Sequence, residues 1–324
     1  MKFEIRALRT IGLAAATAAA FALPGVALAW EPTEEVEIVV HVQSTSSTWT
    51  NADAIARIGR ELDLFPHGIT VTIMEGARGA KAQTYVARTN AGNPHKLQML
   101  VPTQIASQIL SRSEINRDLF RGVAMMLITP KAIAVNASSP YKTFDDLLEA
   151  ARKNPGKINH AGGDLGSTSS MVSRIMEKYF NIDLTYTPFD DQGVLQLLGG
   201  HVDFVFAQPE IVGKFVKAGQ LRFLASSQKL EEFPDVPTLK ELGYDFEVLD
   251  SYRGLWTSKD VPDDAIAFYV DALDKIRQSD EFKEYMKVNS MNEYWVTGEE
   301  LDKSIDREVE VFTEVATEMN LIEK

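Results

Sequence analysis

The chain has 324 residues and a formal net charge of −13 at pH 7, and it contains no cysteine. A charge of this sign argues against nucleic acid and anionic membrane surfaces as partners, because both select basic patches. The lack of cysteine excludes disulfides, thiolate metal sites, a cysteine nucleophile and a lipid-anchored N-terminal cysteine.

The first 29 residues are predicted to be a signal peptide. Basic residues precede an alanine-rich apolar run over 11–21, and Ala27-Leu28-Ala29 supplies the small residues that signal peptidase requires. Pro24 interrupts the run well short of the ~20 apolar residues that span a bilayer. We therefore expect cleavage near Ala29 and a soluble protein in the periplasm.

The next part of the chain alternates between two apolar patterns, one typical of strands and one typical of helices. A run rich in β-branched residues predicts a strand over 36–42, and further apolar runs predict strands over 69–74, 97–101, around 158 and over 202–206. Helices are expected directly after Asp53 and after Thr143, where Thr143-Phe-Asp-Asp146 has the form of a capping box. This order predicts an α/β fold with mostly parallel sheets flanked by helices.

The last third is predicted to be mainly helical. Amphipathic helices are expected over 262–276 and 279–288, and Thr297 precedes a long charged helix that runs towards Met319. We expect these helices to cover the outside of one lobe.

Two extended stretches, 128–135 and 247–256, bracket a strand-and-helix block of about 100 residues. They predict an inserted lobe joined to the first by two crossing strands, with a ligand cleft at the hinge. The predicted division is a signal peptide over 1–29, lobe 1 over 30–132 and 252–324, and lobe 2 over 133–251.

The turn after the first strand is the first candidate binding segment. Its polar residues are Ser44, Thr45, Ser46, Ser47, Thr48 and Asn51. In an open α/β sheet, this turn lies where ligands bind, and free N–H groups at a helix start favour anions. An ordinary polar loop capped by Asn51 or Asp53 is the alternative. Trp49 is expected either to stack on a planar ligand or to pack against the other lobe.

A glycine- and serine-rich turn is the second candidate segment. The residues concerned are Gly163, Asp164, Gly166, Ser167, Thr168 and Ser169. Glycines allow close approach of the backbone, and the serines stand where the next helix begins, so a carboxylate can accept N–H and hydroxyl bonds together. The spacing is not that of a dinucleotide-binding loop. A capped turn without a ligand is the alternative.

The sequence offers no pattern typical of catalysis, a metal site or a cofactor. The five histidines form no His-x-x-x-His pair, and there is no G-x-S-x-G motif. His41 and His160 end predicted strands near the cleft and are expected to be hydrogen-bonding groups rather than bases. Asp190 and Asp191 are adjacent, which places them on different faces.

Several motifs occur in an order that resembles the solute-binding proteins of tripartite tricarboxylate transporters, the Bug-type receptors. They are Asn154-Pro-Gly-Lys-Ile-Asn159, Leu198-Gly-Gly-His-Val-Asp203, Lys217-Ala-Gly-Gln-Leu-Arg222, Pro234-Asp-Val-Pro-Thr238 and Tyr252-Arg-Gly-Leu-Trp256. The resemblance spans essentially the whole chain after the leader. It implies a two-lobe, type II-like periplasmic binding protein, no catalytic activity, and two integral membrane subunits as partners of a monomer.

The resemblance also implies which residues hold the ligand's carboxylate. They are the first loop from Ser44 to Asn51 and the second from Gly163 to Ser169, with Thr103 and Gln208 also lining the cleft. Gly76-Ala-Arg-Gly79 matches a further family loop, although the asparagine that usually precedes it is replaced by Met74.

Departures from the family pattern bear on the ligand. The first loop is longer and carries Trp49, and the family's usual Tyr-Lys-Gly-Gly is Phe189-Asp-Asp-Gln192 here. An acid at Asp190, with Asp164 nearby, would repel a polyanion by a few kcal/mol. We therefore expect a monocarboxylate or dicarboxylate, aromatic or carrying an amino or amide group, rather than citrate. The alternative is that Asp190 and Asp191 face solvent.

Two other functions share part of this pattern. A sensory partner of a two-component system would have the same fold and cleft and would differ only on its outer surface. A secreted hydrolase would need a nucleophile beside a base, and the sequence shows no such pair.

Overall fold

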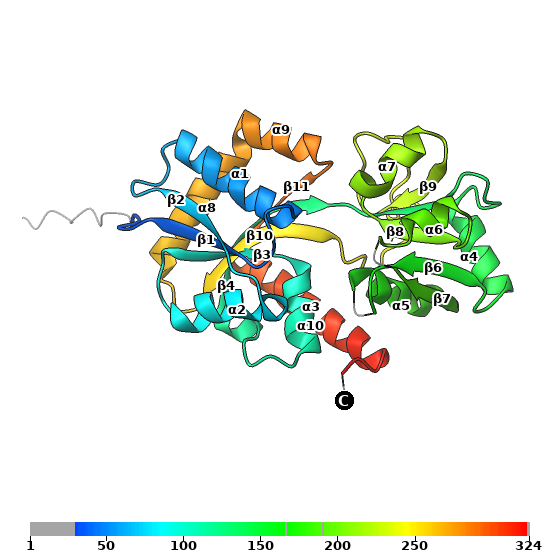
Figure 1. Cartoon of the computed structure of the whole chain (residues 1–324), viewed down its shortest axis with the longest axis horizontal. Helices are drawn as coiled ribbons and strands as arrows, with labels where there is room; N and C mark the ends of the chain where they lie inside the picture. The colour runs from blue at the N-terminus through cyan, green and yellow to red at the C-terminus, as the bar shows by residue number, and fades with distance from the viewer. Residues whose placement is uncertain (1–29, 166, 190, 323–324) are drawn as a thin grey trace, which may run out of the picture.

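Two separate β-sheets form the centres of two lobes (Figure 1). The structure is a computed structural model, and it describes residues 30–165, 167–189 and 191–322. One sheet has six strands in the order β11-β4-β10-β3-β1-β2, and the other has five in the order β7-β6-β8-β5-β9. The predicted two-lobe α/β fold is confirmed.

The six-stranded sheet forms the larger lobe, which holds both ends of the described chain. Its strands are β1 (Val36–Val40), β2 (Ile69–Ile73), β3 (Lys96–Leu100), β4 (Phe120–Thr129), β10 (Ser251–Ser258) and β11 (Asn292–Thr297). Its helices are α1 (Ser47–Glu61), α2 (Ala80–Thr84), α3 (Pro102–Leu110), α8 (Asp263–Gln278), α9 (Asp280–Val288) and α10 (Gly298–Glu318), with short helical segments at Ala77–Gly79, Tyr85–Thr89 and Arg117–Leu119.

Successive side chains of β1 point to opposite faces of this sheet, and both faces are buried. Ile38 packs into the apolar cluster with Ile55 of α1 and Tyr269 of α8, whereas Val39 packs into the cluster on the opposite face. Successive side chains of a strand point to opposite faces, so a strand covered by helices on both sides reads as a continuous apolar run.

The five-stranded sheet forms the smaller lobe. Its strands are β5 (Ala132–Asn136), β6 (Ile158–Gly162), β7 (Leu184–Pro188), β8 (Phe204–Ala207) and β9 (Leu221–Ser226). Its helices are α4 (Phe144–Lys153), α5 (Thr168–Phe180), α6 (Val194–Leu198) and α7 (Pro209–Lys217).

The sheets are mixed, and the prediction that they are mostly parallel was wrong in this respect. β1 runs parallel to β2 and β3, and β6 runs parallel to β7 and β8. However, β10 is antiparallel to β3 and β4, and β5 is antiparallel to β8 and β9. The extended segments that pass between the lobes enter each sheet directly, without the helical crossover that parallel neighbours require.

The chain passes between the sheets twice. β4 ends at Thr129 and β5 begins at Ala132, while β9 ends at Ser226 and β10 begins at Ser251. The predicted boundaries place Ala132 in lobe 1 and Ser251 in lobe 2, one residue away from the sheet to which each belongs. The lobe limits stay a prediction.

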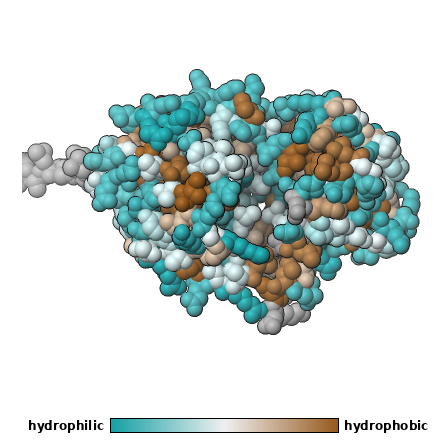
Figure 2. Space-filling view, in the orientation of Figure 1, coloured by the Kyte–Doolittle hydropathy of each residue, from teal (hydrophilic) through white to brown (hydrophobic). Residues whose placement is uncertain are grey.

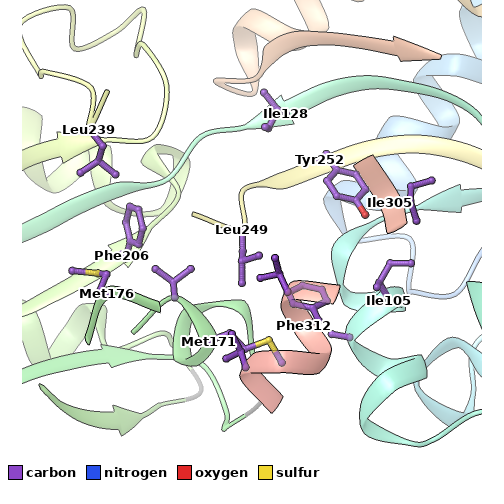
Figure 3. Close-up of a cluster of buried hydrophobic side chains, with 14 of the residues drawn as sticks. Ile105, Ile128, Met171, Met176, Phe206, Leu239, Leu249, Tyr252, Ile305 and Phe312 are labelled. Atoms are coloured by element: carbon purple, nitrogen blue, oxygen red, sulfur yellow. The ribbon is translucent and has the colours of Figure 1, made fainter. Parts of the chain in front are cut away.

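A single apolar cluster joins the lobes at this hinge (Figure 3). Leu249 of the second connection shares this cluster with Met171 of α5, Phe312 of α10, and Ile128 and Tyr252 on the crossing strands. Leu249 is 3% exposed and has a left-handed backbone with φ 53°. The lobes are therefore joined by packing as well as by covalent connections.

Helix α10 belongs to the larger lobe and also contacts the smaller one. It packs on β4 and α3, and it meets α5 of the smaller lobe. Lys178 on α5 pairs with Glu314 and, at 3.0 Å, with Glu318. Within the described ranges, no helix is long and apolar enough to cross a membrane.

Candidate functional site

A cavity of about 780 Å³ lies between the two lobes. The larger lobe contributes residues 41–43, 75, 76, 78, 79, 103, 106, 107 and 110, and the smaller lobe contributes residues 163, 167–169, 192 and 208. Lys131 and Ser251, on the two segments that pass between the lobes, also line the cavity. Figure 2 shows that polar side chains cover most of the surrounding face, with apolar patches set apart on both lobes.

The cavity brings together part of the predicted site. The predicted residues that line it are Thr103, Gly163, Ser167, Thr168, Ser169 and Gln208. Asp164 is exposed and is not among the described residues that line the cavity. Gly166 and Asp190 lie outside the described residues.

The glycine- and serine-rich turn reaches the cavity because its backbone packs closely. A Cβ at Gly162 would lie 2.5 Å from the Tyr186 hydroxyl and 2.6 Å from the Ser169 Cβ. Tyr186 donates a hydrogen bond of 2.6 Å to the carbonyl of Gly163, and burial raises the pKa of Tyr186 to about 12. Ser167 then caps α5 by accepting a bond of 3.3 Å from the amide of Ser170. The start of α5 is thereby fixed at the cavity wall.

The first predicted loop takes a different position. Helix α1 begins at Ser47, with Ser46 as its cap, so the expectation that the helix starts after Asp53 was wrong. The Ser46 hydroxyl accepts a bond of 3.2 Å from the amide of Trp49, which satisfies one of the free donors at the helix start. Consequently, the residues from Ser47 to Asn51 are helical.

His41, Val42 and Gln43 line the cavity and directly precede the predicted residues Ser44 to Asn51. None of those predicted residues is among the described residues that line the cavity. Ser44 and Thr45 are exposed, and Thr48 and Asn51 are buried. Ser47 accepts a hydrogen bond of 2.8 Å from Arg253. Trp49 packs against the apolar cluster beneath α1.

Lys131 is a lining residue that the sequence interpretation missed. It is 3% exposed, and its Nζ donates bonds of 3.0 Å to Thr168 Oγ1 and 2.7 Å to the carbonyl of Leu249. Burial lowers its pKa to about 8. The available signal was a single charged residue within the extended stretch 128–135.

The loop that was matched to the family as Gly76 to Gly79 also lines the cavity, and it adds Arg78. All four of its residues have positive φ, including Ala77 at 47° and Arg78 at 53°. A non-glycine residue in this region costs about 1–2 kcal/mol. A Cβ at Gly79 would approach the His41 ring to 3.1 Å, so glycine is required there. Strain of this kind is common at ligand sites.

His41 is held as a neutral hydrogen-bonding group. Burial lowers its pKa to about 4, and its Nδ1 lies 3.3 Å from the amide nitrogen of Gln104. The amide donates, so Nδ1 accepts and carries no proton. Among the described lining residues, no histidine contacts a serine or threonine hydroxyl, which is the arrangement that nucleophilic catalysis uses.

Asp191 serves the local fold of the smaller lobe. Its carboxylate accepts bonds of 3.0 Å from the amide of Gly193 and 3.1 Å from that of Leu195, at the start of α6. In the part of the chain that the structure describes, no group of three or more acidic or histidine side chains is placed to hold a metal ion.

Comparison with known proteins gives one family. The model of the tripartite tricarboxylate transporter family receptor matches residues 83–321. A UPF0065 protein of Agrobacterium vitis, from the TAR-I ttuE-ttuC' intergenic region, is 28% identical over 148 residues. That alignment covers 44% of this chain and 42% of the relative, so the match spans less than half of the relative's length.

Solved structures with the same fold cover nearly the whole chain. A TctC solute-binding protein from Polaromonas, without ligand, has a TM-score of 0.79 at 24% identity, over 89% of this chain and 99% of that one. An adipate-bound protein of R. palustris has a TM-score of 0.67 at 20% identity, over 88% and 97%. MatC from Rhodopseudomonas palustris, with bound malate, has a TM-score of 0.62 at 20% identity, over 88% and 99%.

Proposed function

We propose, because the chain belongs to the family of tripartite tricarboxylate transporter receptors, that it binds a small carboxylate between its two lobes. The observation that carries this proposal is the cavity of about 780 Å³, which has walls from both lobes and a helix start at one wall. Free N–H groups at a helix N-terminus favour an anion.

The chemistry of the lining supports binding without turnover. Ser167, Thr168, Ser169 and Gln208 offer hydroxyl and amide groups, and Lys131 and Arg78 offer positive charge. Two structural neighbours of this chain, MatC and the adipate-bound protein of R. palustris, hold malate and adipate, which are both small dicarboxylates. We propose a monocarboxylate or dicarboxylate as the ligand and no catalytic role for the cavity.

The rest of the proposal concerns location and partners. The leader over 1–29, with cleavage near Ala29, would deliver a monomeric receptor to the periplasm. There it would transfer its ligand to two integral membrane subunits of the transporter. The sequence of the leader and the family of the chain support this assignment.

The test is calorimetric titration of the purified protein, without its leader, with succinate, malate, adipate, benzoate and citrate. At least one of these acids should bind with a Kd in the micromolar range, equivalent to about 8 kcal/mol. Gln208→Ala, which alters the cavity, should weaken that binding about 3- to 10-fold, as expected for one hydrogen bond.

Gln220→Ala is the matched control, because Gln220 is exposed, follows the end of α7 and does not line the cavity, so it should leave the affinity unchanged. Absence of heat with every acid of this set would contradict the proposed function. Turnover of an ester or amide would contradict the proposal that the cavity is not catalytic.

A further inference from the structure

Lys131 is a buried cation whose hydrogen bonding is incomplete within the described residues. An ammonium has three donors, and the two partners of Lys131, Thr168 Oγ1 and the carbonyl of Leu249, are both neutral oxygens. Asp250 and Glu308 attract it electrostatically, but neither forms an ion pair with it in the described part of the chain. The charge therefore faces the cavity, and no acidic side chain of the described residues forms an ion pair with it.

A buried charge of this kind is costly unless an opposite charge and hydrogen bonds complete its surroundings. Thr168 and Ser169, in the first turn of α5, line the same cavity as Lys131. An anion placed between them would contact the ammonium, the hydroxyls and the helix start together. A carboxylate, with two oxygens and several lone pairs, has the acceptors that this group of donors needs.

We propose that Lys131 is a specificity-determining residue of the cavity, whose ammonium binds one carboxylate group of the ligand directly. The inference rests on the proposed function and adds a residue to it. It predicts that an acid must bring a carboxylate to the hinge end of the cavity, where the two crossings meet, in order to bind well.

The proposal has a consequence for pH that can be measured on the unaltered protein. The free ammonium has a pKa of about 8, and a bound carboxylate favours its charged form. Affinity should therefore be constant well below pH 8 and should fall as the pH rises above that value, because binding then requires uptake of a proton.

The neighbouring groups decide how this profile is interpreted. The charged or titratable groups that act on Lys131 or line the same cavity are His160, Asp250, Glu308, His41, Glu75 and Arg78. Burial lowers the pKa of His160 to about 3 and that of His41 to about 4, so neither changes charge above pH 7. Burial raises the pKa of Asp250 to about 6 and that of Glu308 to about 8, so Glu308 titrates in the same window as Lys131.

The experiment is titration calorimetry with succinate, malate, adipate, benzoate and citrate at about pH 7 and pH 9.5. For each acid that binds, affinity should fall roughly tenfold or more between the two values. Lys131→Met, which keeps the length of the side chain, should weaken binding roughly 30-fold or more at pH 7 and should abolish the pH dependence. Lys131→Arg, which stays charged, should retain binding at pH 9.5.

Two controls separate this role from a structural one. Lys96→Met removes a partly buried lysine that pairs with Glu37 at 2.9 Å, and should change neither the affinity nor its pH profile. Glu308→Gln removes the other group that titrates near pH 8 and should leave the loss of affinity at high pH in place. Circular dichroism confirms that each variant is folded.

The outcomes are distinct for the two proposals. If the wild-type protein binds none of the acids, the receptor proposal is overturned and this inference falls with it. If it binds an acid and Lys131→Met binds as tightly, or if wild-type affinity is the same at both pH values, the role of Lys131 is overturned while the receptor proposal stands. A pH dependence that disappears in Glu308→Gln would also overturn it.

Discussion

At the scale of single residues, Glu308 shows how the hinge controls the charge of a carboxyl group. It lines a second cavity of about 340 Å³ beside α10, and the hydroxyl of Tyr252 donates a hydrogen bond to it. Burial is the main cause that raises its pKa to about 8, and Glu247 acts in the same direction. The group is therefore mostly neutral at pH 7.

We expect Glu308→Gln to stabilise the protein at high pH. Because the pKa is higher in the folded state than in the unfolded state, the wild-type carboxyl favours folding fully below about pH 4.5, and this contribution is lost as pH rises towards 8. A glutamine amide does not titrate, so the Glu308→Gln protein does not lose this stability. At pH 8.5 the free energy of unfolding of the variant should exceed that of the wild type by about 1–2 kcal/mol, a figure reduced for partial solvent exposure.

Urea denaturation at pH 5 and pH 8.5 measures this difference. At pH 5 the variant and the wild type should have nearly equal free energies of unfolding. A gain that is the same at both pH values would mean that titration of Glu308 is not its cause.

The sequence predicted some residues of the cavity and missed others for a physical reason. Thr168 and Ser169 follow a glycine turn at a helix start, a pattern that local sequence reveals. Lys131 and Arg78 instead reach the cavity through the hinge crossing and through a left-handed loop. Their positions depend on how two lobes meet, which no local spacing encodes.

At the scale of single elements, the start of α4 was predicted correctly. Thr143 Oγ1 accepts a bond of 3.1 Å from the amide of Asp146, and the Asp146 carboxylate accepts one of 2.9 Å from the amide of Thr143. Phe144 and Leu147 then face the core. Here the cap residue and the apolar pattern specify the same boundary.

Thr143→Ala should lower the free energy of unfolding by about 1 kcal/mol, because one amide at the helix start loses its partner. The melting temperature should fall by roughly 2–4 °C. Thr297→Ala is the matched control, since Thr297 precedes α10 without a side-chain capping bond and should change the melting temperature much less. Equal effects of the two substitutions in thermal denaturation would contradict this account.

Other elements show where sequence patterns are ambiguous. The turn after β1 offers several possible caps, and Ser46 rather than Asn51 or Asp53 takes that role, which places the start of α1 earlier than predicted. The helical spacing of Val172, Ile175 and Tyr179 alone would place Tyr179 on the buried face of α5, but Tyr179 is 47% exposed and its ring lies 5.3 Å from that of Phe246. In both cases the local sequence allows more than one helix start or buried face, and tertiary contacts determine which one forms.

At the scale of the whole molecule, the two lobes share an apolar core at the hinge. Leu249 contributes to this core from the second crossing, where residues of both sheets and of α10 meet. The two extended stretches, 128–135 and 247–256, predicted two lobes and two crossing strands. The shared core was not predictable, because its members are far apart in the sequence and only the fold brings them together.

Leu249→Ala should lower the free energy of unfolding by about 2–4 kcal/mol, because it leaves a cavity in this shared core. Leu195→Ala is the matched control, as Leu195 is 66% exposed on α6 and its truncation should cost less than about 0.5 kcal/mol. Urea denaturation measures both values. Similar losses for the two leucines would show that the hinge cluster contributes little to stability.

The contacts of α10 also constrain how the lobes can move relative to each other. Its packing on β4 and its ion pairs to α5 connect the lobes along one side of the molecule. A rotation that preserves these contacts must have its axis close to α10, so displacement increases with distance from that helix. The amplitude of opening is then greatest at the edge of the smaller lobe remote from α10, and ligand exchange should occur through that edge.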